Sequence, residues 1–289
     1  MIILDAEATR ACLPMDDAIK AVESAFTEPG EAPLRFQLGS SLFMPGRLGE
    51  VTAVKVVSVV PGNPVGLVAV FDPEGSPLGV VDGPTLTAIR TGAVVGLATR
   101  MLASESASSL AMLGAGAMAF DQVEAIRAVR PLDQVLVWSR DRDRAERLAG
   151  QVGGSSVDHP DEAVSRSLIV ACATPSESAL FSDSSVMPGT HINAVGAFRP
   201  GMVEVPAETV VRAYVVVDDY DGARAEAGDL IQADRDPNAD LRELLADAHP
   251  AIGEDVTFFK SVGVATLDVA AARMALDNAS RLGVGLITG

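Results

Sequence analysis

Aromatic residues, cysteine and histidine are scarce in this chain of 289 residues. Aromatic residues make up 4% of it, and it contains two cysteines, Cys12 and Cys172, and three histidines. Two cysteines are too few for a disulfide framework or a zinc cluster, so we expect both to be small packed residues. The histidines show no metal-ligand spacing, and we therefore expect no metal centre.

Positive charge is also in short supply. The chain has 22 lysine and arginine residues against 39 aspartate and glutamate residues, which gives a formal net charge of −17. Such acidity disfavours binding to nucleic acid and to anionic membranes, and we expect neither as a partner. A bound anion must therefore be held at a few positions where the scarce cations converge.

Long hydrophobic runs are missing as well. No apolar stretch approaches the roughly 18 residues that a membrane span needs, and the opening residues MIILDAEATR lack the basic start and the cleavage site of a secretory signal. We therefore expect a cytoplasmic protein. Hydrophobic residues nevertheless make up 48% of the chain, and its length suits one large domain or two ordinary ones.

The spacing of hydrophobic residues divides the chain into two parts. Residues 15–26 have helical spacing, short β-rich runs follow from 34 to 81, and helical spacing returns over 85–103. From about residue 108, strands alternate with helices, which is typical of βαβ units and a parallel sheet. The pattern predicts an α/β protein: an α+β first domain, a Rossmann-type doubly wound domain, and a long last helix that can pack back on the first domain.

A glycine-rich turn follows the strand-like run at 108–113. Gly114, Gly116 and Ala119 fit the pattern Gly-x-Gly-x-x-Ala, which provides a tight turn, close approach of the backbone to a pyrophosphate, and a small residue where helix meets strand. A second strand about 20 residues later supplies the context that this motif requires. The pattern predicts a dinucleotide site, with a simple tight turn as the alternative.

The end of that second strand indicates which dinucleotide is bound. Ser139 and Arg140 stand where an NAD site usually has an acid for the ribose 2′-hydroxyl, and an arginine there accommodates a 2′-phosphate. The sequence therefore favours NADPH. Asp141 follows one residue later and keeps NADH as the alternative, while we interpret Arg142 and Arg144 as a solvated start of the next helix.

Cations interrupt the apolar patterns of the first domain. Lys55 lies within the apolar face of a strand, where a lysine is expected only if its ammonium group reaches solvent or meets an anion. Arg90 lies close to the apolar stripe of the helix at 85–103, and its guanidinium suits bidentate binding of a carboxylate, with a surface arginine as the alternative. Together with Arg35, a weaker candidate, they would form a cationic pocket for a small anionic substrate.

Five segments together resemble successive motifs of the ornithine cyclodeaminase/mu-crystallin family. They are DGPTLTAIRTGAV (82–94), LGAGAMAFDQVEAIRAVRP (113–131), CATPS (172–176), PGTHINAVG (188–196) and VDDYDGARAEAGDL (217–230). The resemblance implies a homodimer whose chains have two domains. Residues 1–107 and 265–289 are expected to serve substrate binding and dimerisation, and residues 108–264 are expected to bind NAD(P).

The resemblance also implies roles for individual residues. Arg35, Lys55 and Arg90 match the substrate-carboxylate binders of the family, and we expect Lys55 to be the catalytic donor beside an imine nitrogen. The residues expected to contact the cofactor are Thr91, Gly114, Gly116, Ala117, Met118, Ser139, Arg140, Ala173, Thr174, Val195, Ser261 and Gly263.

One stretch departs from part of the family. Cyclodeaminase and alanine dehydrogenase members have an aspartate where this chain has Phe198, and a lysine where it has Met202. The sequence GAFRP is instead similar to the mu-crystallin and ketimine-reductase branch, which reduces cyclic imines with NAD(P)H. We expect Phe198 and Arg199 to contribute to the substrate pocket, with a simple turn position as the alternative for Arg199.

The missing acid distinguishes the possible reactions. Oxidation of an amino acid needs a base to deprotonate its ammonium group, whereas an imine needs mainly orientation and a carboxylate anchor. The expected activity is therefore NADPH-dependent reduction of Δ1-pyrroline-2-carboxylate or Δ1-piperideine-2-carboxylate. Two alternatives stay open: an ornithine cyclodeaminase or alanine-type dehydrogenase with an acid such as Asp82, Asp218 or Asp219, and a non-catalytic NADPH-dependent binder.

Overall fold

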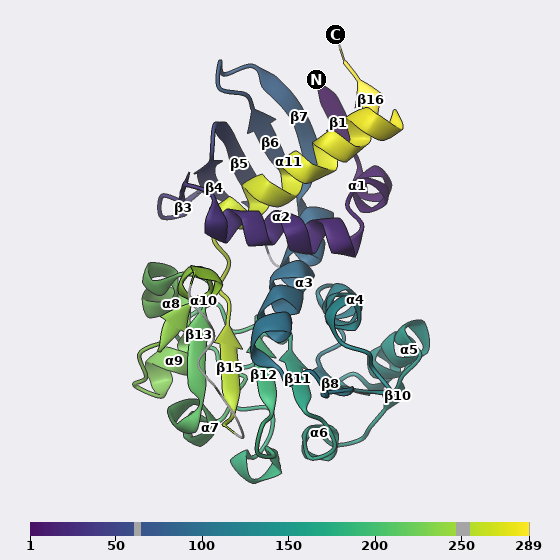
Figure 1. Cartoon of the computed structure of the whole chain (residues 1–289), viewed down its shortest axis with the longest axis vertical. Helices are drawn as coiled ribbons and strands as arrows, with labels where there is room; N and C mark the ends of the chain where they lie inside the picture. The colour runs from purple at the N-terminus through teal and green to yellow at the C-terminus, as the bar shows by residue number, and fades with distance from the viewer. Residues whose placement is uncertain (61–64, 247–254, 289) are drawn as a thin grey trace. The chain divides into compact units, whose positions relative to one another are not determined.

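The computed structural model describes residues 1–60, 65–246 and 255–288, and the chain divides into two units (Figure 1). The first unit consists of Met1–Val94 and Val264–Gly289, and the second consists of Val95–Gly263. The first boundary therefore lies earlier than the expected one at 107/108. The difference arises because helix α3 (Gly83–Leu102) is continuous and contributes residues to both units.

The first unit is built on a mixed sheet. Its strands lie in the order β16 (Leu286–Ile287), β1 (Ile2–Leu4), β7 (Pro77–Asp82), β6 (Gly66–Phe71), β5 (Val51–Ser58), β4 (Ser41–Leu48) and β2 (Gly30–Glu31), and β3 (Phe36–Leu38) pairs with β4. The strands from β7 to β2 are antiparallel to their neighbours, and β1 is parallel to β7. Side chains alternate between the two faces, so Ala53 and Lys55 of β5 both lie on the buried face.

Helices α2 (Met15–Thr27) and α11 (Ala265–Leu282) cover the buried face and lie side by side (Figure 1). Helix α1 (Ala6–Cys12) packs against α11, which itself crosses β4, β5, β6 and β7. Glycines in two strands permit this close packing. A Cβ on Gly46 would lie 3.0 Å from Ala265 Cβ, and one on Gly79 would lie 2.5 Å from Leu276 Cδ2. Helix α11 is thereby held close to β4 at Ala265 and close to β7 at Leu276.

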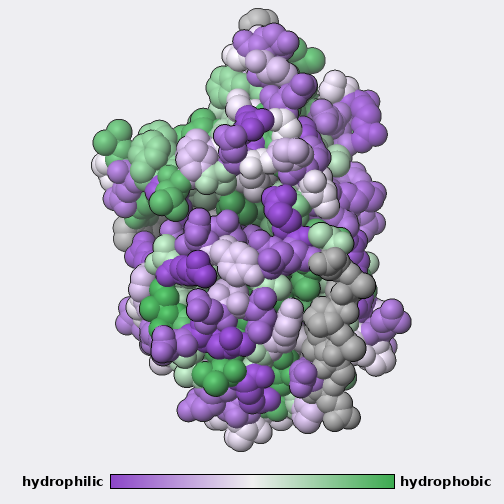
Figure 2. All heavy atoms as spheres, turned by 60° about the vertical axis from the view of Figure 1, so that its left-hand side comes forward, coloured by the Kyte–Doolittle hydropathy of each residue, from purple (hydrophilic) through white to green (hydrophobic). Residues whose placement is uncertain are grey.

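The opposite face of this sheet exposes apolar side chains. The strand register places Phe36 beside Phe43, Phe43 beside Val56, and Val56 beside Leu67, so these four residues form a row across four strands. We call them the outer row. Phe36 is 52% exposed and Leu67 is 42% exposed. Figure 2 shows such hydrophobic groups at the surface among hydrophilic ones.

The second unit is a doubly wound sheet of eight parallel strands, which confirms the predicted fold class. Their order is β10 (Ser155–Ser156), β9 (Gln134–Trp138), β8 (Ser109–Leu113), β11 (Ile169–Cys172), β12 (His191–Ala194), β15 (Thr257–Lys260), β13 (Tyr214–Val217) and β14 (Ala239–Asp240). The chain moves outward from β8 to β10 and then crosses back to β11. The strand order therefore reverses between β8 and β11, the position at which sheets of this kind bind ligands.

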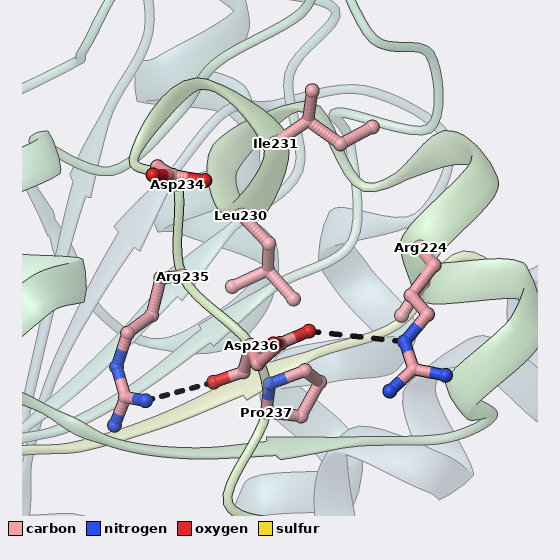
Figure 3. Close-up of a pocket in the computed structure, with 8 residues that line it drawn as sticks. Arg224, Leu230, Ile231, Asp234, Arg235, Asp236 and Pro237 are labelled. Atoms are coloured by element: carbon pink, nitrogen blue, oxygen red, sulfur yellow. Dashed lines mark hydrogen bonds and ion pairs between the residues drawn. The ribbon is translucent and has the colours of Figure 1, made fainter.

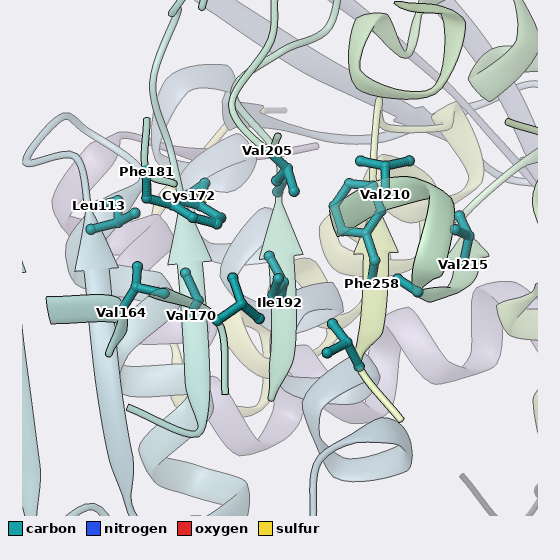
Figure 4. Close-up of a cluster of buried hydrophobic side chains, with 14 of the residues drawn as sticks. Leu113, Val164, Val170, Cys172, Phe181, Ile192, Val205, Val210, Val215 and Phe258 are labelled. Atoms are coloured by element: carbon teal, nitrogen blue, oxygen red, sulfur yellow. The ribbon is translucent and has the colours of Figure 1, made fainter. Parts of the chain in front are cut away.

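Helices connect the strands of this sheet and cover it. They are α4 (Ala119–Val129), α5 (Arg142–Val152), α6 (Pro160–Val164), α7 (Ala207–Arg212), α8 (Tyr220–Glu226), α9 (Gly228–Gln232) and α10 (Leu241–Ala246), with a 3-10 turn at Asp183–Ser185. All residues of β11 and β12 are buried, as expected for parallel strands covered on both faces. Figure 4 shows one core cluster, in which Phe258 packs with aliphatic residues. None of the helices in the described ranges has the length and apolar character of a membrane span.

Candidate functional site

The cations predicted from the sequence converge in the first unit. Lys55 of β5 is 3% exposed and Arg90 of α3 is 6% exposed. The positive charges of Arg90 and of Arg35, which precedes β3, both act on the Lys55 ammonium group. The structure therefore brings together Arg35, Lys55 and Arg90, which lie far apart in the sequence.

A carboxylate that the sequence analysis did not identify completes this cluster. Asp268 of α11 is 1% exposed. Its Oδ2 lies 2.8 Å from Lys55 Nζ, and its Oδ1 accepts a hydrogen bond of 3.0 Å from Arg90 Nε. An acid inside the apolar run ATLDVAAA was the available signal, but Asp268 lies 178 residues from Arg90 in sequence, which hides the pairing.

Burial and neighbouring charges bring the pKa of Lys55 close to neutrality. Burial lowers the pKa of Lys55 to about 8, while Asp268 opposes this shift and Arg90 and Arg35 add to it. Burial alone would raise the pKa of Asp268, but the charges of Lys55 and Arg90 hold it below its ordinary value. Asp268 is therefore an ionised counter-ion, and Lys55 is a lysine that can give up its proton near neutral pH.

The pairing with Asp268 also orients the Arg90 guanidinium. Its Nε is occupied by Asp268 Oδ1, and within the described ranges no side chain or carbonyl accepts a hydrogen bond from its Nη atoms. Two Nη atoms together suit end-on binding of a carboxylate. Thr91, an expected cofactor contact, follows directly and is 7% exposed.

The glycine loop of the second unit follows β8 at the point where the strand order reverses. Gly114 has a φ of +115°, and a Cβ on it would lie 2.8 Å from the carbonyl oxygen of Ala173 after β11. Only glycine fits this combination of backbone angle and close approach. The amides of Ala117 and Met118, just before α4, donate to no acceptor within the described part of the chain. Free amides at a helix N-terminus are the groups that hold a pyrophosphate.

A cavity of about 230 Å³ lies beside this loop, at the carboxyl ends of β8, β9 and β11. Six of the expected cofactor residues line it: Gly114, Gly116, Ser139, Arg140, Ala173 and Thr174. The other lining residues are Ala115, Trp138, Asp141, Arg144, Pro175, Ser176 and Leu180. The loop and the cavity together fit a dinucleotide.

The turn from β9 to α5 presents cations to this cavity. The Asp141 side chain caps α5, because its Oδ1 accepts a hydrogen bond of 3.1 Å from the Arg144 amide, and its Oδ2 lies 3.2 Å from Arg144 Nε. Arg142 pairs with Glu146 and Asp158, as a solvated helix start would. Arg144 also lies in this exposed first turn, with its side chain 62% exposed, and it lines the cavity together with Arg140.

Glu204 connects the loops that follow β11 and β12. This carboxylate is fully buried. Its Oε1 accepts a hydrogen bond of 2.6 Å from the Thr174 amide, and its Oε2 accepts bonds of 2.7 Å from the Gly196 amide and 3.0 Å from the Ala197 amide. The two loops therefore cannot shift independently, and they contain three of the expected cofactor residues: Ala173, Thr174 and Val195.

Asp229 and Lys260 stabilise the position of Glu204. Asp229 Oδ1 accepts hydrogen bonds from the amides of Glu204 at 2.6 Å and Val205 at 3.0 Å, and its Oδ2 lies 2.6 Å from Lys260 Nζ. The side chains of Asp229 and Lys260 are fully buried. Burial raises the pKa of Glu204, and the Lys260 charge opposes that shift.

Asp218 holds the loop after β15. Its Oδ2 accepts hydrogen bonds of 2.6 Å from Ser261 Oγ and 2.8 Å from the Gly263 amide. Ser261 and Gly263 are both expected cofactor contacts. Asp218, one of the three acids that we considered for amine oxidation, therefore holds this loop in place.

The other two acids considered for amine oxidation, and His191, are also engaged. Asp82 accepts a hydrogen bond from the Thr85 amide at 2.9 Å, and Asp219 caps α8. His191 is buried with its Nδ1 2.8 Å from Thr257 Oγ1, and burial lowers the pKa of His191 to about 3. Each of these three groups therefore has a structural partner in the described part of the chain.

Phe198 and Arg199 follow β12 in the second unit. Phe198 is 41% exposed, and Arg199 Cζ lies 5.5 Å from the centre of the Phe198 ring, a cation–π contact. The structure brings these two expected substrate contacts together.

A different hollow of about 240 Å³ lies by α8 and α9 (Figure 3). Its two arginines already have partners: Arg224 Nε lies 3.7 Å from Asp236, and Arg235 donates to the Asp236 carbonyl and to Asn238 Oδ1. The hollow contains none of the expected site residues. We assign the site to the cation cluster and to the cavity beside the glycine loop.

The doubly wound sheet, with a glycine loop at its strand reversal, defines a dinucleotide-binding protein. A model of the ornithine cyclodeaminase/mu-crystallin family matches residues 2–282. The chain is 32% identical over 321 residues to the Δ1-pyrroline-2-carboxylate reductase of Bacillus cereus, covering 99% of this chain and 98% of that relative. It is 37% identical over 217 residues to the ketimine reductase mu-crystallin of Rattus norvegicus, covering 73% and 68%. The chain belongs to the ornithine cyclodeaminase/mu-crystallin family.

Two solved structures have the same fold over the whole chain. Δ1-Pyrroline-2-carboxylate reductase from Thermococcus litoralis, in complex with NADH and L-proline, matches with a TM-score of 0.93 and 30% identity over 100% of both chains. An archaeal alanine dehydrogenase dimer with bound NAD matches with a TM-score of 0.91 and 28% identity over 100% of this chain and 99% of that one. The predicted family and the predicted class of enzyme, a nicotinamide-dependent oxidoreductase, are confirmed.

Proposed function

We propose that this protein reduces a small cyclic imine carboxylate, Δ1-pyrroline-2-carboxylate or Δ1-piperideine-2-carboxylate, to the cyclic amino acid. The observation that carries the proposal is the buried cluster in which Lys55 and Arg90 share Asp268 as counter-ion. The first unit would bind the substrate, and the second unit would bind the cofactor. The relatives named for pyrroline-2-carboxylate and ketimine reduction support this assignment.

Each residue of the cluster has a distinct task in this reaction. The Nη atoms of Arg90, assisted by Arg35, would bind the substrate carboxylate, and Lys55 would donate to the imine nitrogen. When bound, the reduced nicotinamide supplies a hydride, which carries two electrons to the imine carbon. The electron pair of the C=N bond moves to nitrogen, nitrogen takes a proton from Lys55 Nζ, and neutral Lys55 regains a proton from water.

The charge state of the cluster favours reduction over oxidation of an amino acid. Amine oxidation needs a base that is unprotonated at the working pH. With a pKa of about 8, Lys55 is mainly an acid at pH 7, and Asp268 is paired with two cations. Alanine dehydrogenase activity remains the second candidate, because one of the similar structures carries that name.

NADPH is the cofactor that we propose. Arg140 would supply the cation for a 2′-phosphate, whereas the Asp141 carboxylate caps α5 and pairs with Arg144. A carboxylate engaged in this way is not available to the ribose hydroxyls of NADH. NADH is the alternative, since the T. litoralis reductase was solved with it.

A homodimer joined through the first unit is the assembly that we propose. The outer row is an apolar stripe on a chain with a net charge of −17, and such a stripe is typical of a protein–protein interface. The alanine dehydrogenase structure is itself described as a dimer. A second copy of the chain is therefore the partner expected at this face.

A spectrophotometric assay tests the proposed reaction. Purified protein is mixed with NADPH or NADH and with five- or six-membered cyclic imine carboxylates, and absorbance at the dihydronicotinamide band is followed while the cyclic amino acid is quantified. We expect turnover with at least one imine and a higher kcat/KM with NADPH. Absence of turnover with every imine, together with ammonia release from L-ornithine or oxidation of L-alanine, would overturn the proposal.

The variant Phe198→Asp tests the role of the missing acid. We expect it to lose imine reduction at pH 7 and to gain amine oxidation at higher pH, because a carboxylate near the substrate favours removal of a proton. Phe198→Leu is the matched control and should retain reduction. If the two variants behave alike, the residue at position 198 does not determine which reaction the protein catalyses.

A further inference from the structure

Asp268 is a buried charged group of the first unit to which the sequence motifs give no task, and the proposed reaction uses it only as a counter-ion. It holds Lys55 with one oxygen and Arg90 with the other, at 2.8 Å and 3.0 Å. A group that only neutralised charge would not need this division. The arrangement keeps the two cations apart, and each retains N–H groups that do not contact Asp268.

We propose that Asp268 is a positioning residue that assigns the cations their separate tasks: it reserves the Nη atoms of Arg90 for the substrate carboxylate and keeps Lys55 protonated as the donor to the imine nitrogen. This inference rests on the proposed function, because those tasks concern an imine carboxylate. It adds to that function a residue that contacts neither substrate nor cofactor.

The charge balance of the cluster depends on Asp268. Lys55 and Arg90 are two buried cations that share one carboxylate, Asp268, and the positive charge of Arg35 also acts on Lys55. Without Asp268, an uncompensated buried lysine beside two arginines would release its proton, since deprotonation is the cheapest way to relieve that repulsion. Neutral Lys55 would still bind a carboxylate weakly, but it would have no proton to give.

The geometry of the cluster also depends on Asp268. Lys55 Nζ forms an ion pair with Asp268 Oδ2 at 2.8 Å, which holds the ammonium group in place and leaves N–H groups for a ligand. Arg90 has its Nε bound to Asp268 Oδ1, so rotation of the guanidinium away from the end-on orientation breaks that bond. Asp268 thus sets both orientations before substrate arrives.

The helix that carries Asp268 is closely packed on the sheet. Asp268 lies in the first half of α11, and this part of the helix contacts β4 at Gly46, where a Cβ would lie 3.0 Å from Ala265 and 3.2 Å from Val269 Cγ2. Such close contact between helix and sheet prevents the carboxylate from shifting by much. A fixed carboxylate between two cations is preorganised in the sense that catalysis requires.

The chain is well suited to a direct test because it has three lysines: Lys20, Lys55 and Lys260. Incorporation of lysine labelled with 13C at Cε gives three resonances whose pKa values can be followed separately by NMR. Lys20 is exposed, so Lys20→Arg assigns its resonance without touching either buried lysine. Lys55→Met assigns Lys55, and Lys260 then serves as an internal reference in the second unit.

We expect Asp268→Asn to lower the pKa of Lys55 from about 8 by about 1 or more, and to leave the resonance of Lys260 unchanged. The basic limb of kcat against pH should move down by the same amount, so activity recovers on going from pH 8 to pH 6. A structural role would reduce activity equally at both pH values. An unchanged or raised pKa of Lys55 in Asp268→Asn overturns the inference.

Asp268→Glu provides the second test and serves if Asp268→Asn does not fold. It keeps the charge but adds a methylene group in a buried position, so the pKa of Lys55 should stay near 8 while KM for the imine rises about 10-fold or more, because Arg90 is displaced. An unchanged KM would overturn the positioning of Arg90.

Binding of pyrrole-2-carboxylate to the wild-type protein separates this inference from the proposed function. This ligand has a carboxylate at the same position as the imine but a ring nitrogen without charge, so its binding should raise the pKa of Lys55 in the wild type and fail to do so in Asp268→Asn. Turnover of an imine without this pattern would leave the function standing and overturn the inference. The pattern without turnover would support the task of Asp268 in carboxylate binding and overturn the reaction.

Discussion

Lys55 is a buried lysine whose positive charge is balanced by a carboxylate that also pairs with Arg90. It is 3% exposed, it has two arginines as neighbours, and it has one carboxylate as a direct partner. Burial pushes its pKa down and Asp268 pushes it up, which leaves it at about 8. A donor with a pKa close to the working pH transfers protons efficiently in either direction.

The pH dependence of the reaction follows from this pKa. Imine reduction uses protonated Lys55, so kcat should be constant below pH 8 and should fall above it, while amine oxidation uses neutral Lys55 and should rise through the same pH. Lys55→Met should lower kcat of reduction by about 100-fold or more. Initial rates between pH 5.5 and 10 in both directions measure this. If the fall in kcat above pH 8 persists in Lys55→Met, the titration of a group other than Lys55 causes it.

Arg90 provides a second residue-scale prediction. Arg90→Met should raise KM for an imine carboxylate by about 10- to 100-fold, because a charge-assisted bidentate contact is lost. The same variant should reduce a cyclic imine without a carboxylate, 1-pyrroline, as well as the wild type does. Steady-state assays with both substrates make the comparison. A parallel loss with 1-pyrroline would show that Arg90 acts on something other than the carboxylate.

At the scale of elements, the packing of α11 on the sheet determines where Asp268 lies. A Cβ on Gly79 would approach Leu276 Cδ2 to 2.5 Å and the backbone oxygen of Ile2 to 2.6 Å. The leucine end can move, but the backbone oxygen cannot do so without disturbing the pairing of β1 with β7. A single methyl group in β7 therefore acts on the helix that carries Asp268.

Gly79→Ala should reduce the free energy of unfolding by about 1–3 kcal/mol, as overpacking does. Gly150→Ala is the matched control: Gly150 lies within α5, is exposed, and has no atom within 4 Å of an added Cβ. That variant should gain about 0.5–1 kcal/mol from helix propensity. Urea unfolding followed by circular dichroism measures both. Equal stabilities of the two variants would contradict the close packing of α11.

The buried pair of Lys260 and Asp229 joins β15 to α9 in the second unit. Lys260→Met leaves Asp229 and Glu204 without their cation, and we expect it to cost about 3–5 kcal/mol of the free energy of unfolding. Lys20→Met removes an exposed partner of Asp17 and should cost less than about 1 kcal/mol. Both variants remove a lysine from an aspartate pair, so a comparable loss in the two would show that burial is not the cause.

Local patterns in the sequence predicted the elements that have a regular period. The strand at 134–138 agrees with β9, and the helix at 15–26 agrees with α2 apart from its last residue. The short strands β2 and β16 were not predicted, because two residues have no period and their pairing depends on distant strands. The same dependence on distant contacts hid Asp268, Glu204 and Asp229: Arg90 lies 178 residues from Asp268, Thr174 lies 30 from Glu204, and Glu204 lies 25 from Asp229. Motif reasoning found the cations, but only the tertiary structure shows how their charges are balanced.

At the scale of the whole molecule, net charge opposes the association of two chains, whereas exposed apolar surface favours it. Two chains that each carry a net charge of −17 repel one another. In the proposed homodimer, the outer row would offset this repulsion. Phe36, Phe43, Val56 and Leu67 lie in register across four strands, and the ring centroids of Phe36 and Phe43 are 5.3 Å apart. Association should therefore depend on both the row and the ionic strength.

We expect the wild type to be a dimer in 0.15 M salt and to dissociate more readily at low salt, where repulsion between the chains extends beyond the roughly 10 Å Debye length of 0.1 M salt. Leu67→Glu should give a monomer, because it buries a new charge in the interface and adds to the repulsion. Leu282→Glu is the control, since Leu282 is 63% exposed at the end of α11 and outside the outer row. Sedimentation velocity at two salt concentrations measures all three proteins. A dimer that survives Leu67→Glu but not Leu282→Glu would move the interface away from the outer row and onto the end of α11.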